Sequence, residues 1–206
     1  MKLIATILAR NDEARIADAI TSVVDWVDTI LLIDTGVTDS TLSIAEAASN
    51  GKLVTRQFSW CEHYGMARNF ALIQANALGA DWALTVDCQE RMEWPGYSNA
   101  MELKAALQRN ETIRLWNARC KDGSLAKERI IRLPVGAQQH WCGEIFETFQ
   151  GLRSDQFGIL TGARFRVIDQ FQETRRIEWE QAIVRLERTV ANDPGDGQSW
   201  FGLGRA

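Results

Sequence analysis

The sequence predicts an α/β fold with a mostly parallel sheet, and three observations carry this prediction. Short apolar runs in the first half of the chain have the character of buried strands. They alternate with segments whose apolar residues recur at helical spacing, an arrangement typical of parallel strands joined by right-handed helical crossovers. After residue 98 the alternation ends, and a helix is followed by segments typical of an antiparallel hairpin.

The first half of the chain supplies the parallel strands. Three of the four predicted strands are nearly continuous apolar runs, and the third alternates apolar and polar residues. Acidic residues follow the second and fourth strands directly, at Asp34 and Asp87. The four predicted strands cover residues 3–8, 29–33, 53–58 and 82–86.

Three helices are predicted between these strands. The first follows Asn11 or Asp12, either of which is a preferred N-cap residue. Its apolar face is formed by residues at spacings of 4, 3 and 4, namely Ile16, Ile20, Val23 and Val27. The second helix follows a polar turn at 35–41 and ends near Gly51, and the third is the alanine-rich segment 64–78.

The second half of the chain predicts a mixed arrangement. A helix over residues 98–109 precedes two antiparallel strands, which are joined by a loop that contains Asp122 and Gly123. A further strand-like segment follows later in the chain. The predicted strands of this half cover residues 112–119, 127–133 and 163–168.

The last part of the chain predicts a helical tail. An apolar stripe with helical spacing is formed by Trp179, Ile183, Leu186 and Val190. After a Pro-Gly turn, the spacing Trp200-x2-Leu203-Gly204 is the opening of a tetratricopeptide repeat, and one such repeat cannot bury its own apolar face. We therefore expect two units, 1–172 and 173–206, and either a chain that continues past Ala206 or terminal helices that pack on the first unit. A protein partner bound through the helical repeat is also predicted.

Composition and charge exclude several classes of protein. The net charge of -4 gives no basic field for nucleic acid, and no apolar run approaches the ~20 residues of a transmembrane helix. No export signal is visible, so a cytoplasmic location with reduced cysteines is expected. Neither a G-x-G-x-x-G turn nor a Walker A loop is present, which argues against a Rossmann dinucleotide enzyme and a P-loop nucleotidase.

Two smaller features leave alternatives open. Several of the eight tryptophans lie outside clear helices, among them Trp60, Trp94, Trp116 and Trp141. Packing in the core is the favoured role for these rings, and stacking on a sugar or base is the alternative. The mirrored pairs Cys61-x-His63 and His140-x-Cys142 could together supply four zinc ligands. Their spacing is tighter than in the usual structural zinc sites, so a metal centre there is the less favoured alternative.

Polar residues follow three predicted strands, at Arg10-Asn11, Asp34 and Asp87. In open parallel sheets, ligands bind outside the carboxyl ends of the strands. These positions lie in motifs that resemble, in the same order, those of family-2 glycosyltransferases. The resembling segments are 7–13 (an Asn-Glu motif), 34–41 (Asp-x-Gly-Ser-x-Asp-x-Thr), 67–72 (Ala-Arg-Asn), 81–90 (Asp-x-Asp) and 141–147 (Gly-x-Ile-His-Glu). The last segment is similar to a subgroup that carries C-terminal tetratricopeptide repeats.

The resemblance implies a GT-A fold and a role for each matching residue. The nucleotide of a nucleotide-sugar donor would be bound by Asn11, Glu13, Asp34, Arg68 and Asp87. A divalent cation, Mg²⁺ or Mn²⁺, would be held at Asp87 and Gln89 and would offset the charge of the diphosphate leaving group. Glu147, with Glu144 as the alternative, would be the general base of an inverting transfer.

The sequence departs from the family pattern at two positions. Gln89 replaces the second carboxylate of the Asp-x-Asp motif, and Glu90 lies one position later. Phe146 replaces the histidine of the His-Glu pair, and His140 is the nearest imidazole that could take its place. Three functions remain: a glycosyltransferase acting on a glycan, lipid-linked or protein acceptor; a catalytically degenerate nucleotide-binding or protein-interaction module; and a scaffold for the repeat.

Overall fold

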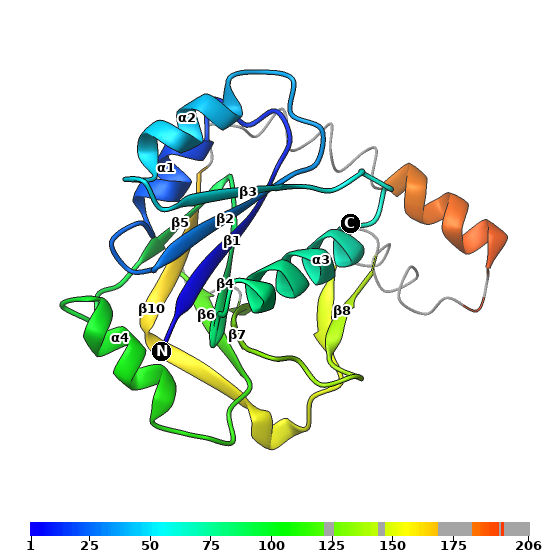
Figure 1. Cartoon of the computed structure of the whole chain (residues 1–206). Coiled ribbons are helices and arrows are strands. Elements are labelled where there is room, and N and C mark those ends of the chain that lie inside the picture. The colour runs from blue at the N-terminus through cyan, green and yellow to red at the C-terminus, as the bar shows by residue number, and fades with distance from the viewer. Residues whose placement is uncertain (122–125, 144–146, 169–182, 194, 196–206) are drawn as a thin grey trace.

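The computed structural model describes residues 1–121, 126–143, 147–168, 183–193 and 195, and confirms the predicted α/β fold (Figure 1). Its largest element is an eight-stranded sheet in the order β3-β2-β1-β4-β7-β6-β10-β5. The first four strands of that order are mutually parallel. They are β1 (Leu3–Ala9), β2 (Thr29–Asp34), β3 (Leu53–Gln57) and β4 (Trp82–Asp87), each within one or two residues of its predicted range.

The rest of the sheet is mixed. β7 pairs antiparallel with both β4 and β6, β10 runs parallel to β6, and β5 is an antiparallel edge strand on β10. These strands are β5 (Glu90–Glu93), β6 (Leu115–Cys120), β7 (Ala126–Arg132) and β10 (Phe157–Val167), the last preceded by the short 3-10 helix η1 (Ser154–Gln156). A separate antiparallel pair is formed by β8 (His140–Cys142) and β9 (Thr148–Gln150).

Helices cover both faces of the sheet (Figure 1). One face packs against α1 (Ile16–Thr21), α2 (Thr41–Ala48) and α4 (Ala100–Gln108). The other face packs against α3 (Tyr64–Ala77) and the β8–β9 hairpin. The strands between these layers are buried on both sides, which is why they appear in the sequence as continuous apolar runs.

The first helix differs from its prediction. All four residues of its predicted apolar face are buried, but α1 ends at Thr21 and the chain continues in turns. The prediction that Asn11 or Asp12 caps this helix is wrong, because α1 begins after Arg15 without a side-chain cap. The Asp12 carboxylate instead accepts a hydrogen bond from the main-chain N–H of Arg10 and pairs with the Arg15 guanidinium.

The described part of the tail is a helix over residues 183–192. Leu186 and Val190 of the predicted apolar stripe are buried, and Arg185 forms an ion pair with Glu62 in the loop before α3. Trp179, the tetratricopeptide-type segment 200–206 and the predicted boundary at residue 172 lie outside the described residues. Within the described chain, no helix combines the length and apolar character that a membrane crossing requires.

The described tryptophans support the packing interpretation. Trp94 and Trp141 are buried, and Trp94 stacks on Trp26 with ring centroids 5.0 Å apart. Trp116 is half-buried and packs against the same core as Trp94, whereas Trp60 makes an edge contact with Tyr64. Core packing is therefore confirmed for Trp94 and Trp141.

Candidate functional site

The loop after β2 is organised by the residue that ends the strand. Asp34 is buried, and its Oδ1 accepts hydrogen bonds from the main-chain N–H groups of Gly36 (2.9 Å) and Val37 (2.7 Å). Gly36 has a φ of 114°, a region that glycine adopts without strain. Asp34 therefore lies where a sheet-edge site is predicted, and this carboxylate oxygen fixes the course of its own loop.

Asn11 and Glu13 connect the loop after β1 to the loop after β2. Asn11 Oδ1 accepts hydrogen bonds from the main-chain N–H (2.9 Å) and the hydroxyl (3.2 Å) of Thr38. Glu13 accepts a 3.1 Å hydrogen bond from the Ser40 N–H, and its own N–H donates to the Asp39 carboxylate. Their contacts are thus with the predicted nucleotide-binding loop, and their role in binding a nucleotide stays a prediction.

Arg68 on α3 contacts both the end of β4 and the residue just before β9. Its Nη2 donates to Asp87 Oδ1 at the end of β4 (2.6 Å), and its Nε donates to Glu147 Oε1 just before β9 (2.5 Å). The guanidinium also lies 5.5 Å from the centre of the Trp141 ring. Three residues that the sequence placed in separate motifs therefore form one largely buried ion-pair network.

The charges of this network stabilise one another. Burial would raise the pKa of Asp87, but the positive charges of Arg68, Lys127 and Arg129 outweigh it and hold that pKa well below its usual value. Burial would likewise lower the pKa of Arg68, and the carboxylates of Glu147 and Asp87 instead raise it. Arg68 and Asp87 are therefore both charged at neutral pH.

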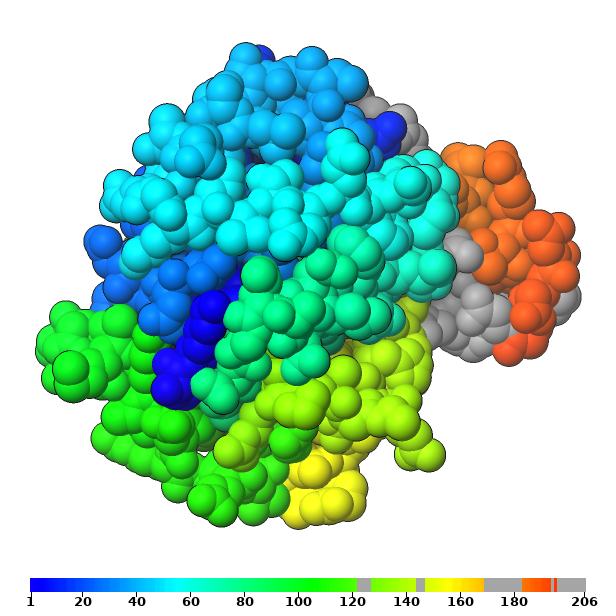
Figure 2. All heavy atoms as spheres, viewed as in Figure 1, coloured from blue at the N-terminus to red at the C-terminus, as the bar shows by residue number. Residues whose placement is uncertain are grey.

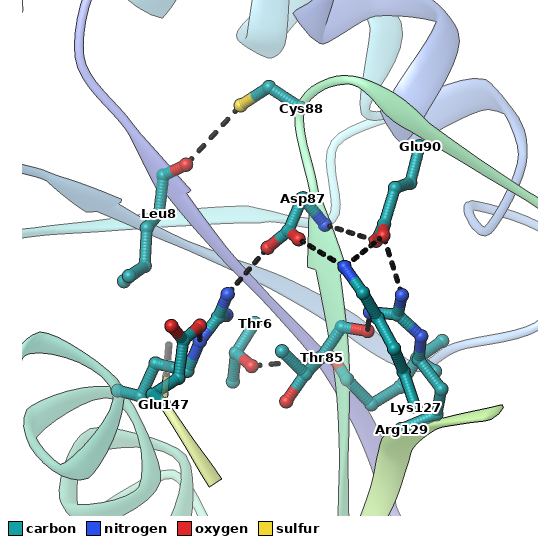
Figure 3. Close-up of polar contacts among 11 residues, drawn as sticks. Thr6, Leu8, Thr85, Asp87, Cys88, Glu90, Lys127, Arg129 and Glu147 are labelled. Atoms are coloured by element: carbon teal, nitrogen blue, oxygen red, sulfur yellow. Dashed lines mark hydrogen bonds and ion pairs between the residues drawn. The ribbon is translucent and has the colours of Figure 1, made fainter. Parts of the chain in front are cut away.

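A second group of charges adjoins Asp87 on β5 and β7 (Figure 3). Glu90 is 1% exposed, and its Oε1 accepts from Arg129 Nη2 (2.6 Å) and from Lys127 Nζ (3.0 Å). Its Oε2 accepts from the main-chain N–H of Asp87 (3.2 Å). The Lys127 ammonium also lies 3.7 Å from Asp87 Oδ2. We call these six residues the Asp87 cluster: Arg68, Asp87, Glu90, Lys127, Arg129 and Glu147.

The helix that carries Arg68 is attached to the hairpin through the next residue in sequence. The Asn69 side chain donates to the main-chain oxygen of Trp141 (2.9 Å) and accepts from the Trp141 N–H (2.8 Å). Gly65 allows a close approach, because a Cβ there would lie 2.9 Å from the Gly143 oxygen. Figure 2 shows α3 lying alongside the yellow-green segment that carries β8. The Ala-Arg-Asn signature thus contains Arg68, which forms the ion pairs, and Asn69, which attaches α3 to the β8–β9 hairpin. We call this attachment the hairpin clamp.

Replacing Asn69 with alanine should lower the free energy of unfolding by about 1–3 kcal/mol. Both hydrogen bonds that half-buried Asn69 forms with the main chain of buried Trp141 would be lost. Urea denaturation followed by circular dichroism measures the effect. Asn76→Ala, at an exposed position of the same helix, is the matched control. Equal midpoints for the two variants would contradict the clamp.

The predicted metal ligands do not form a metal-binding set. Asp87 Oδ1 is hydrogen-bonded to Arg68, and its Oδ2 faces Lys127. Gln89 is a neutral amide and Glu90 is already paired with two cations. Among the described residues, no three His, Cys, Asp or Glu side chains gather as a metal-binding group. The donor set at Asp87 therefore does not fit Mg²⁺ or Mn²⁺, which favour several oxygen ligands, and metal binding stays a prediction.

Two further predictions concern the alternative general base and the alternative zinc site. Glu144 and Phe146 lie outside the described residues. The alternative zinc site is not found among the described side chains. His63 Nδ1 accepts from the Met66 N–H and caps α3, and His140 Nδ1 lies 3.0 Å from the main-chain oxygen of Gln138.

Lys127 and Arg129 are the site residues that sequence analysis missed. They lie two positions apart in β7, a strand whose remaining residues include Ile130 and Ile131. Arg129 is 2% exposed, and a buried charge in a central strand requires a buried counter-charge. The signal was therefore the pair of cations in a predicted strand, but the sequence did not show which carboxylate they would meet.

Comparison with known proteins is informative over part of the chain. No protein-family model matches it. An uncharacterized glycosyltransferase of Rickettsia felis is 33% identical over 91 residues, which are 44% of this chain and 30% of that protein. A tetratricopeptide repeat-containing protein of Synechococcus elongatus is 29% identical over 106 residues, 52% of this chain and 24% of its own length. The matches span less than a third of either relative.

Solved structures resemble this chain at low sequence identity. A candidate nucleotide-diphospho-sugar transferase from Desulfovibrio desulfuricans is 10% identical, with a TM-score of 0.40 over 64% of each chain. Similarity at that level carries no argument about activity. The chain is thus similar in sequence, over part of its length, to a protein named as a glycosyltransferase.

Proposed function

We propose that this chain is a GT-A-type glycosyltransferase domain similar to family 2, which transfers a sugar from a nucleoside-diphosphate donor with inversion. The observation that carries the proposal is the contact of Arg68 with both Asp87 and Glu147. It brings together three sequence motifs, and each of them has a place in the chemistry of sugar transfer. Sequence similarity to the rickettsial glycosyltransferase supports the same activity.

The contacts of these residues support a proposed role for each of them. The nucleotide lies against the loops held by Asn11, Glu13 and Asp34, at the carboxyl ends of β1 and β2. Glu147, held by Arg68 at the hairpin, accepts the proton of the acceptor hydroxyl. The acceptor oxygen attacks the anomeric carbon from the face opposite the leaving group, and the nucleoside diphosphate departs with the bonding electrons.

Replacing Glu147 with glutamine should lower the rate of sugar transfer or donor hydrolysis about a hundredfold, because the amide cannot accept the proton. Release of nucleoside diphosphate from uridine, guanosine and thymidine diphosphate sugars measures this rate. Binding of the matching nucleoside diphosphate, measured by calorimetry, should change by less than about twofold, since the proposed role of Glu147 concerns the acceptor and not the nucleotide. Glu111→Gln, at an exposed position before β6, is the control.

The degenerate alternative is favoured by the replacements at Gln89 and Phe146. It predicts that the wild-type chain binds a nucleoside diphosphate but releases none from any donor sugar, so that Glu147→Gln changes nothing. Measurable turnover would exclude this alternative. The acceptor class, the tetratricopeptide-repeat subgroup, the division at residue 172, the protein partner and the cytoplasmic location stay predictions from the sequence.

A further inference from the structure

Sugar transfer requires positive charge at one place in particular. As the bond from the anomeric carbon to the diphosphate breaks, its electron pair moves to a phosphate oxygen and negative charge develops there. A divalent cation is one way to stabilise this charge, and positively charged side chains are another. Near Asp87, the described part of this chain has positively charged side chains that could stabilise this negative charge.

Arg129 is already committed to the fold. Its guanidinium is 2% exposed, donates to Glu90 and, at 3.3 Å, to the main-chain oxygen of Thr85, and lies 4.3 Å from the centre of the Phe165 ring. Arg68 is committed in the same way to Asp87 and Glu147. Neither guanidinium can turn toward a ligand without giving up a short hydrogen bond to a carboxylate that is at most 16% exposed.

Lys127 is different from both arginines. Its side chain is 38% exposed, and its ammonium lies between two carboxylates that each have an arginine partner, Asp87 and Glu90 (Figure 3). An ammonium has three donor hydrogens on a flexible stem, so it can turn toward a ligand while the arginines continue to neutralise the carboxylates. Among the described cations of the Asp87 cluster, Lys127 is therefore the one with remaining capacity.

We propose that the Lys127 ammonium, and not a divalent cation, supplies the charge that binds and stabilises the donor's diphosphate. This inference rests on the proposed function. It explains why Asp87 faces an ammonium where the family pattern implies a metal, and why a neutral Gln89 can stand in place of the second carboxylate. During transfer the anomeric carbon exchanges its bond to the diphosphate for one to the acceptor oxygen, whose proton passes to Glu147.

The test is calorimetric titration of uridine, guanosine and thymidine diphosphate into the chain, with Mn²⁺ and again with a chelator. For the wild-type chain, the two conditions should give affinities for the preferred nucleotide within about twofold of each other. Lys127→Met should weaken binding about tenfold or more in both conditions, because a charged hydrogen bond to phosphate is lost. Lys127→Arg should retain most of the affinity.

Controls separate binding from folding and the inference from its premise. Lys121→Met removes a half-exposed lysine that faces Glu93, outside the cluster, and should bind as the wild type does. Thermal melting measures whether each variant is folded. If Lys127→Met is unfolded, Lys127→Arg tests the assignment, because it should be folded and should retain most of the nucleotide affinity.

Each contrary outcome has a distinct meaning. Binding that needs Mn²⁺ would overturn the inference and leave the proposed function intact. Binding that needs no metal but is unchanged in Lys127→Met would refute the role of this lysine. Failure of all three nucleotides in both conditions would overturn the proposed function, and the inference with it.

Discussion

Replacing Arg68 with methionine should lower the free energy of unfolding by about 3–5 kcal/mol at neutral pH. The change removes the cation that lies between Asp87 and Glu147, whose side chains are only 16% and 15% exposed. Two carboxylates would then remain in a largely dehydrated site, with Lys127, 3.7 Å from Asp87, as the remaining described ion-pair partner. Methionine preserves most of the side-chain volume, so the loss reports on charge more than on packing.

The cost of this substitution should depend on pH in a direction set by Asp87. In the wild-type chain the pKa of Asp87 is held well below its usual value, so its stabilising contribution is present above about pH 4 and is lost as the pH falls further. In the variant, burial without Arg68 should raise this pKa, and protonation then relieves an unpaired charge. The difference in stability between the two proteins should therefore shrink between about pH 7 and about pH 4.

Urea denaturation at several pH values measures both effects. Arg56→Met, at an exposed position of β3, is the control for the loss of a surface arginine. Arg68→Lys should be intermediate, because one ammonium cannot reproduce the two directed hydrogen bonds of the guanidinium. An Arg68→Met variant that is as stable as the Arg56→Met control would show that the network contributes nothing to the fold.

The parallel half of the fold was predictable because burial on both faces leaves a plain signal. β1, β2 and β4 are predominantly apolar, and β2 and β4 each end at an aspartate, Asp34 and Asp87. β5, β8 and β9 gave no comparable signal. They have three or four residues of mixed polarity, and β5 pairs with β10, so that Glu93 meets Arg164 across 71 positions of sequence.

The candidate site was predictable in its members and not in its connections. Strand ends identified Asp34 and Asp87, and the Ala-Arg-Asn signature identified Arg68. That Arg68 would join Asp87 to Glu147 depends on where α3 and the hairpin lie, since the two partners of this arginine are 19 and 79 positions away. Pairing of β7 beside β4, which brings Lys127 to Asp87, depends on the same long-range packing.

Replacing Glu90 with alanine should also lower the free energy of unfolding by about 3–5 kcal/mol. Glu90 is 1% exposed and accepts hydrogen bonds from Arg129, from Lys127 and from the main chain of Asp87. Its removal leaves the 2% exposed guanidinium of Arg129 without a carboxylate partner beside the Phe165 ring. Chemical denaturation of the variant measures the loss.

A double-mutant cycle distinguishes the free-energy cost of breaking the Glu90–Arg129 ion pair from the cost of removing either side chain alone. Glu90→Leu with Arg129→Leu removes both charges, and apolar replacement of a buried pair is commonly far less costly than removal of one partner. We therefore expect the double variant to be more stable than Glu90→Leu alone. Costs that simply add would mean that the two side chains act independently. A large coupling energy would instead assign Arg129 to the neutralisation of Glu90, which leaves Lys127 available to the diphosphate.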